Sequence, residues 1–358
     1  MENLIGQMKD VFTLATNAIS FIKSVMENNE NSKDYAKLAS SGGYAKLASS
    51  GYNAKLASSG GYAKLASSGY NAKLASSGGY AKLASSGGNA KLASSGGYAK
   101  LASSGYYAKL ASSGGYAKLA SSGDDAKLAS SGYNAKLASS GDDAKLASSG
   151  YYAQLDVVGK KSVATSIGMH GLIKAIKGTW VTLAEYRKNK EGKHEVYFVK
   201  TEKVDGKIIK QKTWYGLYDK KFREYQEFDN IGCLILNKKG NAYKIYNFSS
   251  REIGYVIKSD DTYSHGKSIK EARESLIYKL SNRDTSEFKK WAINKKISLK
   301  QAIQSYRAIT GACEYGVKSF CDGVKTPKSL TPKKVIELTM GQFGNDKYAE
   351  FFGGNNGK

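Results

Sequence analysis

Histidine, cysteine and proline are scarce in this chain. Its 358 residues include 3 histidines, 3 cysteines and 2 prolines. The cysteines all lie in the second half of the chain, which does not suit a secreted disulfide scaffold, so we expect a reducing, cytoplasmic setting. His170, His194 and His265 lie too far apart for a local metal motif, and Cys313 and Cys321 lack the spacing of a zinc site. We therefore expect no metal and no cofactor.

Long apolar runs are missing as well. No stretch approaches the roughly 20 apolar residues that a membrane-spanning helix needs. The N-terminal segment carries Lys9, Asp10 and Lys23 within its apolar pattern and lacks a small-residue cleavage site, so we expect no signal peptide. These absences predict a protein that is neither secreted nor inserted in a membrane.

A nine-residue repeat, Ala-Lys-Leu-Ala-Ser-Ser-Gly plus two variable residues, dominates the first half of the chain. It begins at Ala36, runs thirteen times and degrades at Ala153. The variable pairs alternate in kind, which doubles the true period to eighteen residues. Units this short need their neighbours to bury an apolar side, so the repeat predicts a solenoid. We expect coils of eighteen residues, each with two short strands that belong to two different parallel sheets.

Within one unit, the alternation of side chains along a strand places Ala36 and Leu38 on one side and Lys37 and Ala39 on the other. Because lysine is rarely buried, alanine and leucine should form a thin core. Ser-Ser-Gly is the expected corner, where serine hydroxyls satisfy turn amides and glycine adopts backbone angles closed to other residues. Strands about 4.8 Å apart would build a rod of roughly 30 Å.

The remaining segments predict a mainly β protein with a helical part. Apolar residues at three- and four-residue steps from Ile5 to Met26 indicate an amphipathic helix that caps the open end of the solenoid, with an oligomerisation helix as the alternative. A small antiparallel β domain and a C-terminal helical bundle follow the solenoid, with capping signals for helices near 268–281, 285–294, 298–322 and 331–341. The expected domains are 1–34 (capping helix), 35–178 (parallel β-solenoid with degenerate closing coils), 179–260 (β domain), 261–345 (basic helical module) and 346–358 (flexible tail).

The net charge of +24 is unevenly distributed. From Gln154 onward there are 39 basic and 22 acidic residues, which give +17 of the total. Such a balance favours anionic partners, nucleic acid first. The preferred binding residues lie in the helical end, although interleaved acids also suit an ordinary solvated surface. These candidates are Lys289, Lys290, Lys295, Lys296, Lys300 and Arg307.

The solenoid offers a second candidate surface. Lysine columns beside tyrosines resemble the charge and stacking surfaces that hold single-stranded nucleic acid. The alternative, which we favour, is that the tyrosines stack on one another while the lysines keep the sheet soluble. The candidate residues are Lys64, Lys82, Lys100, Tyr62, Tyr80 and Tyr98. Four carboxylates, Asp124, Asp125, Asp142 and Asp143, either bind a cation or, as we prefer, neutralise the lysine columns.

Catalytic candidates are few. Cys313, in Thr310-Gly-Ala-Cys-Glu-Tyr-Gly316, could meet His265 in space as a nucleophile and its base. A cysteine that packs a helix beside small residues is the commoner case. We therefore expect that the protein is not an enzyme.

The repeats resemble the Ala-x-Leu-Ala-Ser-Ser-Gly arrays of phage-encoded and gut-Firmicute proteins. Gly178-Thr-Trp-Val-Thr-Leu-Ala-Glu185, followed by Val204-Asp-Gly-Lys-Ile208 and Thr213-Trp-Tyr215, is similar to a domain of unknown function that often follows such arrays. The resemblance covers about two thirds of the chain and brings no catalytic residues. It implies a phage or mobile-element context, in which small proteins that block host defence are common.

These observations predict a cytoplasmic, non-catalytic binding protein. Its expected partner is a host protein or nucleoprotein complex that handles nucleic acid, such as a CRISPR-type defence complex, or nucleic acid itself. The basic helical module would make the contact, and the solenoid would act as a spacer or occluding arm. A structural, self-assembling repeat protein is the first alternative and a Cys313-dependent enzyme the second, and the oligomeric state stays open.

Overall fold

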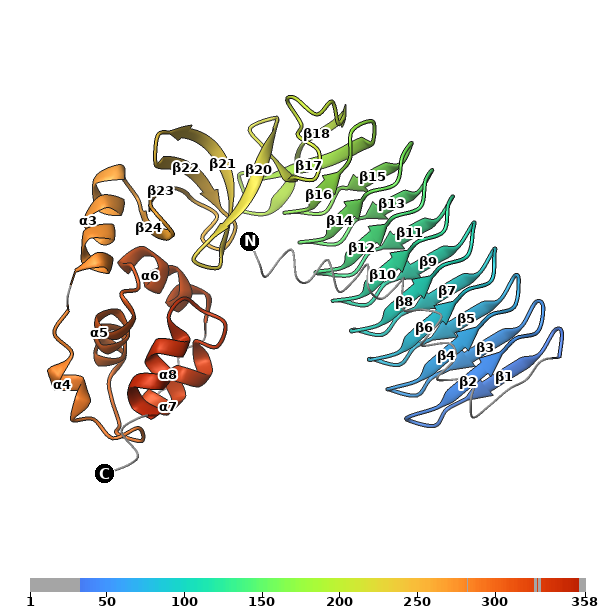
Figure 1. Cartoon of the computed structure of the whole chain (residues 1–358), viewed down its shortest axis with the longest axis horizontal. Helices are drawn as coiled ribbons and strands as arrows, with labels where there is room; N and C mark the ends of the chain where they lie inside the picture. Colours follow the sequence, from blue (N-terminus) through green and yellow to red (C-terminus); the bar gives the residue numbers. More distant parts are fainter. Residues whose placement is uncertain (1–32, 282, 325–326, 328–329, 354–358) are drawn as a thin grey trace. The chain divides into compact units, whose positions relative to one another are not determined.

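The computed structural model describes residues 33–281, 283–324, 327 and 330–353 (Figure 1). The chain divides after Glu224 into two units, which we describe one at a time. The expected capping helix of residues 1–34 lies outside the described residues except for its last two positions.

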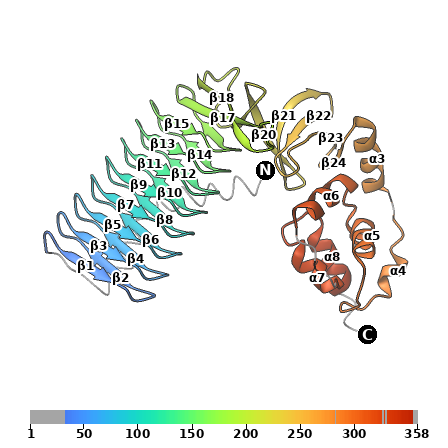
Figure 2. The ribbon, with the colours of Figure 1, turned by 180° about the vertical axis from the view of Figure 1, so that it is seen from behind.

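Strands of the first unit alternate between two parallel sheets, as the doubled period predicts (Figures 1 and 2). Each residue pairs with the residue eighteen positions later, for example Lys37 with Lys55. The first sheet, called the odd sheet, contains β1 (Lys37–Ser40), β3 (Lys55–Ser58), β5 (Lys73–Ser76), β7 (Lys91–Ser94), β9 (Lys109–Ser112), β11 (Lys127–Ser130), β13 (Lys145–Ser148) and β15 (Val163–Ser166). The second, called the even sheet, contains β2 (Lys46–Ser49), β4 (Lys64–Ser67), β6 (Lys82–Ser85), β8 (Lys100–Ser103), β10 (Lys118–Ser121), β12 (Lys136–Ser139), β14 (Gln154–Val157) and β16 (Leu172–Ala175). The predicted parallel solenoid of two-strand, eighteen-residue coils is confirmed.

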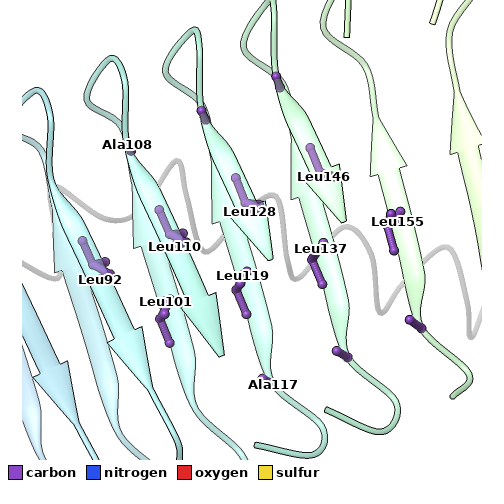
Figure 3. Packing of buried hydrophobic residues seen from close by; sticks show 14 of the residues in the cluster. Leu92, Leu101, Ala108, Leu110, Ala117, Leu119, Leu128, Leu137, Leu146 and Leu155 are labelled. Atoms are coloured by element: carbon purple, nitrogen blue, oxygen red, sulfur yellow. The ribbon is translucent and has the colours of Figure 1, made fainter. Parts of the chain in front are cut away.

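Leucine and alanine form the thin core between the two sheets. Leucines of both sheets point inward in columns, as Figure 3 shows for Leu92 to Leu155, and Leu92, Leu101 and Leu110 are at most 1% exposed. Most of the serines that end these strands also turn inward. The hydroxyls of several accept a hydrogen bond from the corner glycine, as from Gly60 N to Ser58 Oγ (3.1 Å), whereas those of Ser85, Ser121 and Ser139 do not. The predicted inward residues and the serine cap are both found.

The corner glycines are required for a reason other than the expected one. No described corner glycine from Gly51 to Gly168 has a positive φ. A Cβ placed on Gly96 would instead lie 1.8 Å from the carbonyl oxygen of Gly78, one coil earlier. The left-handed backbone occurs instead at the second variable position of many corners, as at Asn71 (φ 59°), where it suits asparagine. The corner glycine is there because one coil's backbone rests directly on the next.

The sheets of the solenoid continue past the expected boundary at residue 178. Strand β17 (Trp180–Lys188) adds to β15 in parallel, and β18 (His194–Lys203) pairs with β17 antiparallel. Strand β19 (Trp214–Tyr218) pairs antiparallel with β16, and the first half of β20 (Lys221–Phe228) pairs with β19. Larger residues, including Ile173 and Tyr215, fill this end of the same core. The predicted β domain of residues 179–260 is therefore shared between the two units.

The second unit joins an antiparallel meander to helices. The second half of β20 pairs with β21 (Ile231–Lys239), followed by β22 (Ala242–Asn247), β23 (Ile253–Ser259) and β24 (Thr262–Gly266). The helices are α3 (Ile269–Leu280), α4 (Ser286–Lys289), α5 (Leu299–Thr310), α6 (Glu314–Gly323), α7 (Pro332–Leu338) and α8 (Asn345–Gly353). Apolar side chains of α4, α5, α7 and α8 share one core.

Two expectations for this unit are wrong in detail. The single helix expected at 298–322 is two helices, because Gly311 takes a left-handed conformation (φ 79°) that ends α5, and Cys313 caps the start of α6. The flexible tail expected from residue 346 contains helix α8, whose Tyr348 and Phe352 are fully buried at i and i+4. Residues 354–358 of that tail lie outside the described residues.

The eighteen-residue coil predicts different effects for two internal deletions. Deleting Ala54–Asn71 removes one whole coil and should leave a shorter, folded rod. Deleting Ala54–Tyr62 removes half a coil, so every later strand would have to join the sheet opposite to its own. This variant should therefore be less stable by on the order of 2 kcal/mol. Thermal unfolding measures the difference. Equal stability of the two variants would contradict the eighteen-residue coil.

The corner contacts predict that alanine destabilises the solenoid at one glycine and is tolerated at its neighbour. Gly96→Ala should destabilise the solenoid by about 1–3 kcal/mol, because the added Cβ meets the Gly78 carbonyl oxygen at 1.8 Å. Gly97→Ala is the matched control, since the nearest atom to its Cβ lies 4.0 Å away, and the change should stay within about 0.5 kcal/mol. Urea unfolding of both variants checks this, and a neutral Gly96→Ala would show that the corner tolerates a side chain.

Candidate nucleic-acid interface

The lysines of residues 289–300 are presented on a segment whose apolar side chains are buried. Phe288 and Trp291 pack edge to face with ring centres 5.0 Å apart, and Ile297 N donates to Leu330 O (2.9 Å). All three anchors contribute to the helical core. The chain between them therefore keeps its polar side chains at the surface, although α4 ends at Lys289 and the residues that follow are not helical.

Five of the six predicted binding residues are exposed on this segment. We call them the basic cluster: Lys289 ends α4, Lys290 caps it, Lys295 and Lys296 lie in the following loop, and Lys300 is in the first turn of α5. Residues 284–300 hold five lysines and two acids. Lys295 Nζ lies 4.5 Å from the ring centre of Trp291, which fixes its stem on the buried anchor. The cluster is a local surface of positive charge on a rigid support.

Arg307, the sixth candidate, is engaged inside the unit. Its Nε donates to Ala312 O (3.3 Å), its Nη1 lies 3.4 Å from Glu314 Oε2, and its guanidinium sits 4.8 Å from the Tyr278 ring centre. These contacts join the end of α5 to α6 and α3. We therefore leave Arg307 out of the basic cluster and assign it a positioning role for these helices.

A lysine of the predicted basic helical module extends this surface from a second segment. Lys333, exposed in the first turn of α7, donates its backbone N–H to Ile293 O (3.0 Å), which places it beside the 289–296 segment. The Thr331-Pro332 start of the helix was visible in the sequence, and Thr331 caps it by accepting from Lys334 N (3.1 Å). The pairing of two segments about forty residues apart was not visible, because it depends on tertiary contacts.

Tyrosines on the even side of the solenoid form a continuous stack, here called the tyrosine ladder. Its rings are nearly parallel, with centres 5.0–5.1 Å apart and planes within 11°. Each inner ring therefore has both faces covered by its neighbours, so a nucleic-acid base could stack only at the end of the column. The arrangement supports the alternative that these rings stabilise one another. The members are Tyr44, Tyr62, Tyr80, Tyr98 and Tyr116.

Lysines of the even sheet form the predicted column beside the ladder. Lys64, Lys82 and Lys100 pair in register on adjacent strands. Partial burial, and then the charges of Lys100 and Lys64, lower the pKa of Lys82 below its ordinary value. Like charges held this close repel one another, and an anion lying along the column would relieve that repulsion.

The four predicted aspartates lie at corners of the solenoid, where they support the backbone. Asp142 N donates to Asp124 Oδ1 (2.8 Å), and Lys160 N donates to Asp142 Oδ1 (2.7 Å), so each carboxylate bonds the amide one coil later. Asp125 and Asp143 occupy left-handed corner positions, with φ of 56° and 55°. Within the described residues no group of three or more metal-ligating side chains occurs. The carboxylates thus extend the coil-to-coil hydrogen bonding.

The structure brings Cys313 and His265 together, as the sequence suggested. Cys313 Sγ and His265 Nδ1 are 3.8 Å apart, and the sulfur accepts from Gly316 N (3.3 Å) at the start of α6. Burial raises the pKa of the Cys313 thiol and lowers that of His265 to about 3. Both groups are held neutral, which opposes the thiolate that nucleophilic catalysis needs.

The self-stacked ladder predicts little effect of its rings on partner binding. Replacing Tyr62, Tyr80 and Tyr98 by threonine keeps β-propensity and removes the stack. Stability should fall modestly, by roughly 0.5–1 kcal/mol for each stacked pair removed, while affinity for a single-stranded oligonucleotide should change less than about twofold. Fluorescence anisotropy measures the affinity. A tenfold loss of affinity in a variant with an unchanged circular dichroism spectrum would make the ladder a binding surface.

Comparison of the chain with family models, curated proteins and solved structures gives no match in any of the three. No helix of the described residues is long and apolar enough to cross a membrane. A solenoid fold is compatible with many functions, so function has to be argued from the side chains described above.

Proposed function

We propose that this protein is a non-catalytic binding protein that contacts nucleic acid, alone or within a nucleoprotein complex, through the basic cluster. The observation that carries the proposal is the set of five exposed lysines on a segment fixed by buried Phe288, Trp291 and Ile297. Lys333 extends the same surface from α7. A cluster on a rigid support loses little conformational freedom when it binds a polyanion.

The chemistry of the cluster favours contact with phosphates over reading of bases. Lysine is a point charge without the forked geometry that arginine offers to a guanine edge. Trp291 is buried and covered by Phe288, which leaves it unable to stack on a base. Binding should therefore be independent of sequence and strongly dependent on salt, since each bound phosphate releases counterions.

In this proposal the solenoid acts as a spacer or occluding arm. The rings of its tyrosine ladder stack on one another, and the length of the solenoid is fixed by the number of its coils. The resemblance of the repeats to phage and Firmicute arrays supports a host complex that handles nucleic acid, such as a CRISPR-type defence complex, as the target, in the cytoplasm of a cell that carries the phage or mobile element. The arm would then block or space access to that complex.

A structural, self-assembling protein is the second candidate. It is favoured by the parallel in-register coils, which make every added repeat lengthen the rod by the same step. A protein that serves only as a spacer would have no need for the basic cluster, and nucleic-acid binding therefore separates the two candidates.

Neutralising the basic cluster should weaken nucleic-acid binding. The variant Lys289→Gln, Lys290→Gln, Lys295→Gln and Lys296→Gln should reduce affinity for a double-stranded oligonucleotide about tenfold or more. It should also flatten the slope of log affinity against log salt by up to about 0.9 for each phosphate that the variant no longer neutralises. Titrations between low and moderate salt measure both quantities.

A matched control exists in the solenoid. Lys55, Lys73, Lys91 and Lys109 are exposed on the odd sheet, and their replacement by glutamine changes the net charge by the same amount. This control should keep most of the affinity. If both variants bind equally weakly, the attraction is a property of net charge and the basic cluster is not the site.

A further inference from the structure

Strand β18 forms an open edge of the odd sheet. It is the last strand in the order of that sheet, and among the described residues it pairs with β17 alone. It is 10 residues long, and its Val196, Tyr197 and Val199 are 51%, 42% and 48% exposed, so the strand faces solvent along this stretch. A row of backbone N–H and C=O groups at the edge of a sheet is a template for one more strand.

Each face of β18 offers one apolar and one cationic side chain to an added strand. Lys200 pairs with the buried Leu183 and so lies on the core side, where Phe198 also packs against the core. Val199 lies on the solvent side, and Lys203 follows four residues later on that same side. A strand that carries carboxylates together with apolar residues would complement both faces.

The surroundings of this edge are basic. Residues 187–203 hold six basic and three acidic residues, which give a net charge of +3. Lys220, in the turn before β20, adds to this charge, since its Nζ lies 5.3 Å from the ring centre of Tyr197 and 5.5 Å from that of Phe198. Two copies of the edge would bring these charges together, so the lysines oppose pairing of β18 with itself. An acidic chain would be attracted to the same place.

An acidic peptide suits this edge better than nucleic acid does. An extended peptide can pair its own N–H and C=O groups with those of the edge, whereas a phosphodiester backbone has no N–H donors. The Arg187 guanidinium lies 3.7 Å from the centre of the Tyr197 ring and covers one of its faces, so no base can stack there.

We propose that β18 binds an extended acidic segment of a partner protein, which adds to the odd sheet as one further strand. Backbone hydrogen bonds hold the segment, its carboxylates face Lys200 and Lys203, and its β-branched residues cover Phe198 and Val199. The proposal does not rest on the basic cluster, because β18 belongs to the first unit and the basic cluster to the second.

A labelled peptide tests this binding with the full-length protein. The probe carries Glu-Thr-Val-Glu-Val-Val between glycines, which is the order that an antiparallel strand opposite residues 198–203 requires. One control peptide has lysine in place of both glutamates, and a second has the same side chains with N-methylated backbone amides. Fluorescence anisotropy measures the Kd values. We expect the probe to bind at least about tenfold more tightly than either control.

Two neighbouring proline variants locate the binding on the open edge. Successive N–H groups of a strand point to opposite edges, so Val199→Pro and Lys200→Pro each remove one, the first from one edge and the second from the other. The variant that loses a bond to β17 should unfold at a Tm lower by about 5 °C or more. The other should keep its Tm and bind the probe at least about tenfold more weakly than alanine at the same position, which retains the N–H.

Several results would overturn the proposal. Equal binding of the N-methylated peptide would show that charge alone holds the probe, and a lower Tm in both proline variants would show that β18 has no open edge. The stable proline variant could also bind the probe as well as its alanine control, or lose affinity for a single-stranded oligonucleotide and not for the probe, which would assign the edge to nucleic acid. A dimer seen by sedimentation and abolished by that variant would assign the edge to a second copy.

Discussion

Contact between the backbone of one coil and that of the next, eighteen residues later, is the constraint on which the first unit depends. Lys55 N donates to Ala36 O (2.8 Å), and the same bond recurs along the repeats. At the corners the glycines let carbonyl oxygens approach to distances that no side chain permits. Because this contact fixes the register between successive coils, the side chains at each position of the repeat form a straight column.

The columns explain both the core and the surface of the solenoid. Leucine columns from the two sheets meet in an interior that contains no large side chain until the closing coils, where Ile173, Val181 and Tyr215 thicken it. The tyrosine ladder is the same effect on the outside, since rings held one coil apart stack on one another. A column also repeats unfavourable contacts. Partial burial and the like charges of Lys100 and Lys64 lower the pKa of Lys82 in the lysine column.

The second unit is held together in a different way. Its short segment at residues 288–297 is held by three buried anchors and not by regular hydrogen bonding, which leaves its lysines exposed on a fixed support. In the same unit, Cys313 Sγ and His265 Nδ1 lie 3.8 Å apart. Burial raises the pKa of the thiol and lowers that of the imidazole, which favours the neutral form of each, and the cysteine caps a helix.

The amino-acid sequence alone determined the solenoid, because a strict local repeat offers one way to bury its apolar side. The eighteen-residue coil, the inward leucines, the stacked tyrosines and most of the basic cluster follow from it. Tertiary structure decided what depends on contacts between distant segments: the continuation of the sheets into β17 and β19, the break at Gly311, the burial of α8 and the placing of Lys333 beside Ile293.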